Sequence, residues 1–167
     1  MVLFHTAEPV YDENSLVLLL GTFPSPKSRE YGFFYGHPQN RFWRVLAAVF
    51  GSPPLNTIEE KKAFLLREQI ALWDVIASCE IVGASDASIK NPKPTDLSRI
   101  FNTANIGAVY TTGTTATKLY HRFFGKNNII LPSTSPANAA MSLEKLTESY
   151  MQIRTKRDEL KNSTSEK

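Results

Sequence analysis

The sequence predicts an α/β fold, in which helices cover both faces of a parallel sheet. Four short apolar segments have the composition of buried strands, and they lie at residues 16–20, 70–75, 107–113 and 128–133. Segments with helical periodicity or helix-capping residues lie between them. This alternation is typical of a parallel sheet, because each parallel pair of strands needs a crossover connection.

Two helices are predicted between the first and second strands. The first covers residues 40–50, where apolar side chains form one stripe at Phe42, Val45, Leu46, Val49 and Phe50. Gly51, which Ser-Pro-Pro follows, ends this helix. Thr57 and Glu60 form a capping box that predicts a second helix through about Arg67.

The region after the second strand is predicted to be less regular. Residues 78–94 contain Gly, Ser, Asn and two Pro, so we expect a long loop there. Thr95 is expected to cap a short helix whose apolar residues are Leu97, Ile100 and Phe101. The third strand ends at a turn near Gly113, and a helix through Tyr120 follows the turn.

The C-terminal part is predicted to be one helix and a tail. Ser142 can cap this helix, and its apolar face carries Leu143, Leu146, Tyr150 and Ile153. Residues 161–167 are polar, and we expect them to fray. Residues 1–160 then form a single domain, which suits a chain of 167 residues.

Composition argues against several classes of protein. No apolar run is long enough to cross a bilayer, and the N-terminal residues lack the basic and apolar regions of a secretory signal. The single cysteine, Cys79, cannot form an internal disulfide or a cysteine-rich metal site. We therefore expect a cytoplasmic protein. The formal charge of +3 fits a polyanionic partner but is too small to indicate one by itself.

The loops with unusual chemistry are predicted to meet at one edge of the sheet. Right-handed crossovers bring the carboxyl ends of parallel strands together, so loops 21–40, 74–94 and 132–141 should face one another. The first of these loops is rich in Pro, Gly, Ser and aromatic residues before it enters a helix. Open α/β folds bind their ligands at this edge, so we expect the site there.

Three motifs follow predicted strands in a fixed order. They are Gly21-Thr-Phe-Pro-Ser, then Gly36-His-Pro-Gln-Asn-Arg-Phe-Trp, then Leu131-Pro-Ser-Thr-Ser-Pro. Together with Ala71-Leu-Trp-Asp-Val-Ile and Ser88-Ile-Lys-Asn-Pro, this set resembles the uracil-DNA glycosylase superfamily. Within it the chain is most similar to the hypoxanthine-DNA glycosylase (deoxyinosine glycosylase) group, which is related to the mismatch-specific uracil/thymine-DNA glycosylases. The resemblance runs from about Leu18 to Tyr150.

The resemblance implies a three-layer α/β/α fold with a central, mainly parallel four-stranded sheet. It implies a DNA repair enzyme that hydrolyses the N-glycosidic bond of a flipped-out deaminated base, with hypoxanthine favoured and uracil possible. It implies no metal or organic cofactor, and double-stranded DNA with a deaminated or mismatched base as the partner. No membrane is implied, and we expect a monomer of bacterial or archaeal type that works at the nucleoid.

Two positions depart from the uracil-excising pattern. Phe23 stands where the mismatch-specific branch carries a polar residue that positions the attacking water. Leu131 stands at the first position of the last motif, where a His is expected. Ordinary uracil chemistry therefore does not transfer residue by residue, and the water needs another side chain.

Asn40 and His37 are the catalytic candidates. An amide can accept from water and donate to a base edge, so Asn40 can position the water or contact the base. Asn is also a good helix N-cap, and both roles can coexist. His37 can neutralise the leaving base or contact a phosphate, but a lone histidine is more often structural. Asp74 is the one carboxylate that is a candidate general acid or base, although the sequence favours a helix cap or a salt bridge for it. His5 has no supporting context.

The remaining site candidates fall into three groups. Phe23 is expected to stack on the flipped base, and the pocket is completed by Gly21, Thr22, Phe34, Tyr35 and Asn91. Phosphate contacts are predicted for Ser25, Lys27, Ser28, Ser133, Thr134 and Ser135. A loop that enters the minor groove is predicted at Pro136, Ala137 and Asn138, where no bulky wedge residue stands.

Two alternative functions stay open at this point. One is a mismatch-type uracil or thymine glycosylase that works through Asn40 alone. The other is a non-catalytic module that binds damaged or single-stranded nucleic acid. The departures from the family pattern at Phe23 and Leu131 are compatible with this second function.

Overall fold

The central element of the fold is a four-stranded parallel sheet. The computed structural model describes residues 1–165, and its strands lie in the order β3-β2-β6-β7. Their bounds are Val17–Gly21 for β2, Ile70–Asp74 for β3, Ala108–Thr112 for β6 and Ile129–Leu131 for β7. All three neighbouring pairs are parallel, so the predicted sheet is confirmed.

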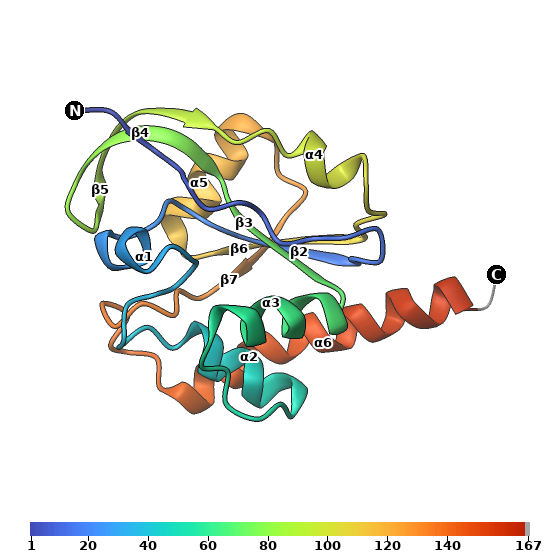
Figure 1. Cartoon of the computed structure of the whole chain (residues 1–167). Helices are drawn as coiled ribbons and strands as arrows, with labels where there is room; N and C mark the ends of the chain where they lie inside the picture. The colour runs from blue at the N-terminus through green and yellow to red at the C-terminus, as the bar shows by residue number, and fades with distance from the viewer. Residues whose placement is uncertain (166–167) are drawn as a thin grey trace.

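Helices cover both faces of this sheet (Figure 1). One face carries α2 (Phe42–Phe50), α3 (Ile58–Arg67) and the long α6 (Leu143–Ser165). The opposite face carries α5 (Thr114–Phe123), with the short α4 (Ser98–Phe101) beside it, and α1 (Pro26–Tyr31) lies beyond the carboxyl end of β2. The three-layer α/β/α arrangement implied by the family resemblance is therefore confirmed.

The first strand and the helix after it form as their sequences predict. The four apolar residues Val17–Leu20 are fully buried, as expected for a strand with helices on both faces. The predicted apolar stripe of α2 faces the core, and Gly51 ends the helix in a left-handed conformation with φ 63°. Thr57 Oγ1 accepts the Glu60 N–H at 3.0 Å, so the predicted cap of α3 is confirmed.

A second, antiparallel sheet replaces the predicted long loop. The strands β4 (Ile76–Val82) and β5 (Ser85–Pro94) form a hairpin, and β1 (Leu3–Phe4) pairs with β4. The loop prediction for residues 78–94 was wrong. The hairpin is irregular, because its register shifts three times and its turn uses Gly83 at φ 57°. Such bulges remove the strict apolar and polar alternation that identifies a strand in a sequence.

Thr95 has a different partner from the one expected. Its hydroxyl donates to the carbonyl oxygens of Asp74 at 2.9 Å and Val75 at 3.1 Å, so it ties the end of the hairpin to β3. The Asp96 carboxylate instead accepts the Ser98 N–H at the start of α4. The prediction that Thr95 caps this helix was therefore wrong.

The last helix begins as predicted and ends later than expected. Ser142 Oγ accepts the Lys145 N–H at 3.1 Å, which confirms the predicted cap. The helix continues through Ser165, well into the segment expected to be a frayed tail, and residues 166–167 lie outside the described part of the chain. No helix within residues 1–165 is long and apolar enough to cross a membrane.

Candidate active site

A cavity of about 380 Å³ opens at the carboxyl edge of the central sheet. We call it the strand-end cavity. It is lined by the loops that follow β2 and β7, by Asp74 at the end of β3, by Thr112 at the end of β6, by the turn region of the β4–β5 hairpin and by the N-terminal residues Thr6 and Ala7. Residues of all three predicted loop regions therefore meet here, although the region 74–94 contributes strand ends and a hairpin turn in place of a loop.

The floor of the strand-end cavity lies where neighbouring strands end side by side. Gly21 and Asp74 are paired across β2 and β3. A Cβ atom on Gly21 would lie 2.6 Å from Asp74 Oδ1 and 2.8 Å from the Tyr35 hydroxyl oxygen. Glycine is therefore the residue that lets a carboxylate and a phenol approach the same point of the floor.

Tyr35 is held firmly on this floor. Its backbone has a φ of 54°, its ring stacks on Phe42 at a centroid distance of 3.8 Å, and its hydroxyl bonds Thr112 Oγ1 at 3.2 Å. Burial raises the pKa of the Tyr35 phenol well above its usual range, and the negative charge of Asp74 raises it further. Tyr35 therefore serves as a neutral phenol.

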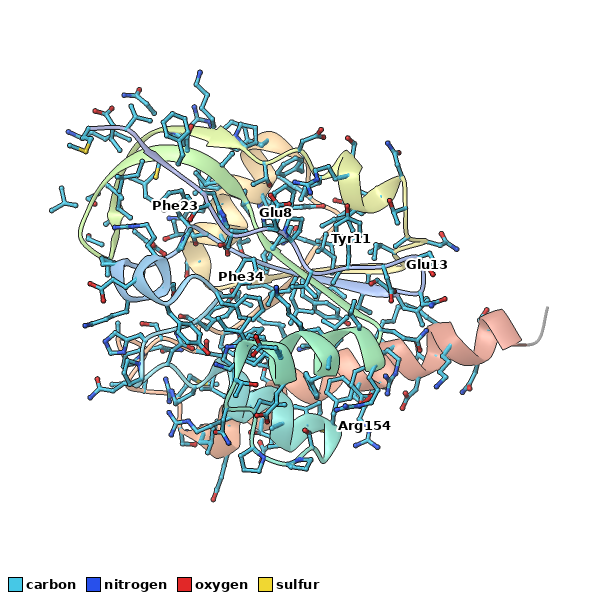
Figure 2. The ribbon with its side chains drawn as sticks, in the orientation of Figure 1. Glu8, Tyr11, Glu13, Phe23, Phe34 and Arg154 are labelled. Atoms are coloured by element: carbon cyan, nitrogen blue, oxygen red, sulfur yellow. The ribbon has the colours of Figure 1, made fainter. Side chains whose placement is uncertain are left out.

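Two more aromatic rings form the walls of the strand-end cavity. Phe23 is 8% exposed and Phe34 is 2% exposed, and both lie near α1 beside the strand ends (Figure 2). The Phe23 ring contacts the edge of the His5 ring at a centroid distance of 5.9 Å. The Phe34 carbonyl accepts the Trp43 indole N–H at 3.0 Å, so the wall is anchored to α2. Both rings therefore belong to the core and to the cavity.

Asn40 lies in the strand-end cavity and also binds the first N–H of α2. Its side-chain oxygen accepts the Phe42 N–H at 2.9 Å and the Thr134 hydroxyl at 2.8 Å. These two bonds use both lone pairs of the amide oxygen. Within the described residues the Asn40 NH₂ group donates no hydrogen bond, so it is the part of the side chain available to a ligand.

The loop after β7 is fastened to the start of α2. The Arg41 backbone N–H donates to Thr134 O at 3.1 Å. The Arg41 guanidinium donates to the carbonyl oxygens of Ser135 at 3.0 Å, of Asn138 at 3.1 Å and of Met141. The predicted DNA-contacting loop is thus a rigid part of the site, because one cation holds three of its carbonyls.

The other candidates from this loop divide between two hollows. Ser133, Thr134, Ser135, Pro136 and Ala137 line the strand-end cavity. Asn138 does not, and its amide donates to Ser133 O at 2.9 Å. Asn138 instead lines an adjacent, more open hollow, which shares several lining residues with the strand-end cavity and is bounded by Gly113 and Thr114 at the start of α5.

The two serines of the first loop that were predicted to contact phosphate already form hydrogen bonds within the protein. Ser25 caps α1 by accepting the Ser28 N–H at 3.2 Å, and Ser28 Oγ accepts the Gly36 N–H at 2.9 Å. Both serines line the strand-end cavity, as does His37, whose Nδ1 accepts the Gln39 N–H at 3.1 Å. Lys27 does not line the cavity and forms a 3.7 Å ion pair with Glu30.

Asn91 lies away from the cavity. It is an exposed residue of β5 with φ 50°, and its amide donates to Glu80 on the neighbouring strand. Asn91 is not among the residues that line the strand-end cavity. The reason is the hairpin, which turns the segment into a strand whose side chain pairs across β4.

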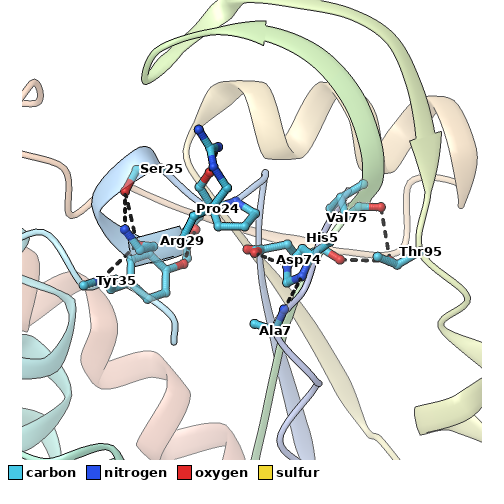
Figure 3. Close-up of polar contacts among 12 residues, drawn as sticks. His5, Ala7, Pro24, Ser25, Arg29, Tyr35, Asp74, Val75 and Thr95 are labelled. Atoms are coloured by element: carbon cyan, nitrogen blue, oxygen red, sulfur yellow. Dashed lines mark hydrogen bonds and ion pairs between the residues drawn. The ribbon is translucent and has the colours of Figure 1, made fainter. Parts of the chain in front are cut away.

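A histidine and an aspartate form a buried pair that the sequence did not suggest. His5 Nε2 lies 2.7 Å from Asp74 Oδ2, and the two side chains are 3% and 7% exposed (Figure 3). The pair joins residues 69 positions apart, through the short N-terminal strand. No local pattern could have indicated it, because the pairing of β1 with the unpredicted hairpin brings His5 to the site.

Asp86, on the same hairpin, is a second carboxylate in the strand-end cavity. Burial raises the pKa of the Asp86 carboxyl group, a hydrogen bond from Thr22 lowers it, and the nearby charge of Asp74 raises it. Ionisation of Asp86 is therefore less favourable than that of an exposed carboxyl group. The sequence did not predict Asp86 at the site, because residues 78–94 were expected to form an irregular loop, in which the position of a side chain cannot be foreseen.

The fold and this site define an α/β protein with an aromatic-walled cavity at the carboxyl ends of its parallel strands. A family profile described as the uracil DNA glycosylase superfamily matches residues 8–157. The chain therefore belongs to the uracil DNA glycosylase superfamily, a group of DNA glycosylases.

Relatives with assigned names agree with this membership. A hypoxanthine DNA glycosylase of Methanosarcina acetivorans is 31% identical over 143 residues, which cover 83% of this chain and 90% of the relative. A hypoxanthine DNA glycosylase of Methanosarcina barkeri is 39% identical over 85 residues, which cover 50% of this chain and about half of the relative, 53%.

A solved structure shares the fold. The solution NMR structure of a "putative Uracil DNA glycosylase" from Methanosarcina acetivorans superposes with a TM-score of 0.74 at 28% identity. The match covers 92% of this chain and 99% of that one.

Proposed function

We propose that this protein is a monofunctional DNA glycosylase that removes hypoxanthine from DNA and leaves an abasic site. The observation that carries the proposal is the strand-end cavity itself. It is a partly open space beside Phe23, Phe34 and Tyr35, with strand ends at its floor, and its volume is usual for small-ligand sites. A base inside a duplex must leave the stack to be hydrolysed, and such a cavity suits a flipped base.

Asn40 acts on the leaving base in this proposal. Its oxygen already accepts hydrogen bonds from the Phe42 N–H and the Thr134 hydroxyl, so it has no lone pair left to accept one from water. Its NH₂ group can donate to a base nitrogen or oxygen on which negative charge grows as the glycosidic bond breaks. A preorganised donor of this kind typically contributes about 100- to 1000-fold in rate.

The attacking water needs a strong acceptor, and Asp86 supplies it in this proposal. Phe23 provides no polar atom at the place where related enzymes carry one, and Asn40 has no free lone pair. Asp86 lines the cavity, and a hydrogen bond with Thr22 holds its carboxylate. A carboxylate can orient the water and stabilise the positive charge that develops on the sugar.

The DNA backbone is expected to run from the strand-end cavity into the adjacent hollow. Ser133 and Ser135 line both, and the N-terminus of α5 faces the second through Gly113 and Thr114. Free N–H groups at a helix start attract phosphate. The loop of Pro136 and Ala137, which Arg41 holds, is then placed to support the opened duplex.

The groups that line the cavity support hydrolysis without strand cleavage. A lyase step needs a nucleophilic amine beside the sugar. No lysine lines the strand-end cavity among residues 1–165, and the candidate Lys27 is paired with Glu30. The preference for hypoxanthine is supported by the two Methanosarcina relatives, which are named for that base.

The proposal is tested with duplexes that contain one deoxyinosine, deoxyuridine, xanthine or mismatched thymine. We expect release of hypoxanthine, with strand breaks seen only after alkali treatment. Strand breaks without alkali would contradict the monofunctional mechanism. Tight binding without release of any base would contradict the glycosylase itself and leave a damage-binding module.

A further inference from the structure

The side-chain amide of Asn40 has an accepting end and a donating end, and its neighbours fix which end is free. The Phe42 backbone N–H donates to one side-chain atom of Asn40 at 2.9 Å, so this atom must be the oxygen. The Thr134 hydroxyl lies 2.8 Å from the same oxygen and must donate its only proton to it. The NH₂ group of Asn40 is therefore the end that stays free for a ligand.

Two donors on one amide oxygen fix the amide more completely than one donor does. The lone pairs of a carbonyl oxygen lie close to the plane of its substituents, so hydrogen-bond donors prefer that plane. With the Phe42 N–H alone, the amide could still turn about this one bond. The second bond, from Thr134, removes this freedom and fixes the directions of both N–H bonds of Asn40. Thr134 also takes the lone pair that a water molecule would otherwise use.

Thr134 is held from both sides of its own segment. It is 2% exposed, and its carbonyl oxygen accepts the Arg41 backbone N–H at 3.1 Å. Two residues earlier, the Pro132 carbonyl accepts the Tyr150 hydroxyl at 2.6 Å. After Thr134, the Arg41 guanidinium donates to three carbonyl oxygens within residues 135–141. The Thr134 hydroxyl is therefore fixed relative to α2, which Asn40 precedes.

The Arg41 cation depends on this loop for its own stabilisation. Its Nε atom is buried and has no hydrogen-bond partner. Within residues 1–165, no carboxylate forms an ion pair with Arg41. The three loop carbonyls are thus the groups that compensate its charge, and a cation that lost them inside the protein would be costly. The loop that carries Thr134 is therefore held in this one position.

We infer that Thr134 is a positioning residue, which sets Asn40 to donate to the leaving base instead of accepting from water. This inference rests on the proposed function and names the residue that gives Asn40 its part in it. Ser133 and Ser135 differ from Thr134, because their hydroxyl oxygens accept backbone N–H groups and keep their protons for a phosphate. The Thr134 proton is already used on Asn40.

The first test is a double-mutant cycle on a duplex with one deoxyinosine. Thr134→Val removes the hydroxyl and keeps the branched shape of the side chain. We expect it to lower the single-turnover excision rate by about 10-fold, as for one lost hydrogen bond. In the Asn40→Ala background the same change should have no further effect, because Thr134 acts through the Asn40 side chain. Thr134→Ser keeps the hydroxyl and should keep most of the rate.

Thr117→Val is the matched control. Thr117 is 6% exposed on α5, and its hydroxyl bonds Thr111 Oγ1 at 2.7 Å and donates to Gly113 O at 2.8 Å. It lines neither hollow, so Thr117→Val should lower the melting temperature about as much as Thr134→Val and leave the excision rate unchanged. An unchanged rate in Thr134→Val, or an equal loss with and without the Asn40 side chain, would overturn the inference.

A measurement on the free protein separates this inference from the proposed function. NMR relaxation of the Asn40 side-chain NH₂ group reports how rigidly the amide is held. If the wild-type protein excises no base, the proposed function fails. An Asn40 NH₂ group that is rigid in the wild type, mobile in Thr134→Val and rigid in Thr117→Val would still support the positioning by Thr134. Equal mobility in the wild type and in Thr134→Val would refute it, whatever the activity.

Discussion

Asn40 offers the sharpest separation of structure from catalysis, because its two ends do different work. Asn40→Ala removes the acceptor for the Phe42 N–H and for the Thr134 hydroxyl. The lost cap costs about 1 kcal/mol, and the lost hydroxyl bond costs about 1 kcal/mol more. A domain is typically stable by about 5–15 kcal/mol, so the variant stays folded. Its melting temperature should fall by about 4–8 °C.

The effect of Asn40→Ala on catalysis should be larger than its effect on folding. Loss of the NH₂ donor to the leaving base should lower the single-turnover rate on deoxyinosine duplex by about 100- to 1000-fold. Rates are measured with enzyme in excess, and folding is followed by calorimetry of the same preparations. A rate within about threefold of wild type would remove Asn40 from the mechanism, since donors of this kind contribute far more.

Asn40→Asp is the matched control. Aspartate keeps an acceptor for Phe42 N–H and Thr134, so the melting temperature should stay close to that of the wild type. It lacks the NH₂ donor, so the rate should be as low as in the alanine variant. If Asn40→Asp restored the rate, the residue would act as an acceptor toward water, and the assignment of its donor to the base would be refuted.

Three further predictions concern the cavity walls and floor. Gly21→Ala should cost about 1–3 kcal/mol of stability by overpacking and should lower activity. The reason is that the added Cβ would lie 2.6 Å from Asp74 Oδ1. A variant with the Tm and the excision rate of the wild type would refute this close approach. Phe23→Leu should slow excision of every base by about 10-fold through lost stacking, and an effect confined to one base would contradict that role. Burial raises the pKa of Asp86, so its ionisation costs stability as the pH rises through that pKa. Asp86→Asn should therefore have a higher Tm than the wild type near pH 7 and nearly the same Tm near pH 3. Calorimetry at both pH values measures this. An equal Tm difference at the two pH values would contradict a buried Asp86 carboxyl group.

The sheet and its helices were predictable because their signals are local. The apolar run before Gly21 is buried on both faces, and Thr57 and Gly51 mark helix ends through short-range hydrogen bonds and a left-handed turn. The hairpin was not predictable in the same way. Its bulged register and its polar residues lack strict alternation, and its pairing with the N-terminal strand is visible only in three dimensions.

Of the candidate site, the part that lies on loops after the parallel strands was predictable from the sequence, and the part that depends on the hairpin was not. Loop residues such as Asn40 and Thr134 line the cavity as expected, because parallel strand ends must meet at one edge of a sheet. The positions of Asp86 at the cavity and of His5 against Asp74 could not be expected, since both depend on the antiparallel sheet. The same sheet places Asn91 on β5, away from the cavity.

We propose that a flipped hypoxanthine enters the strand-end cavity and that the protein hydrolyses its bond to the sugar there. The decisive experiment is a single-turnover assay on a duplex with one deoxyinosine, with chromatography of the released base and gels run with and without alkali. We expect free hypoxanthine and a strand break only after alkali. No free base from the wild-type protein, at saturating enzyme, would contradict it.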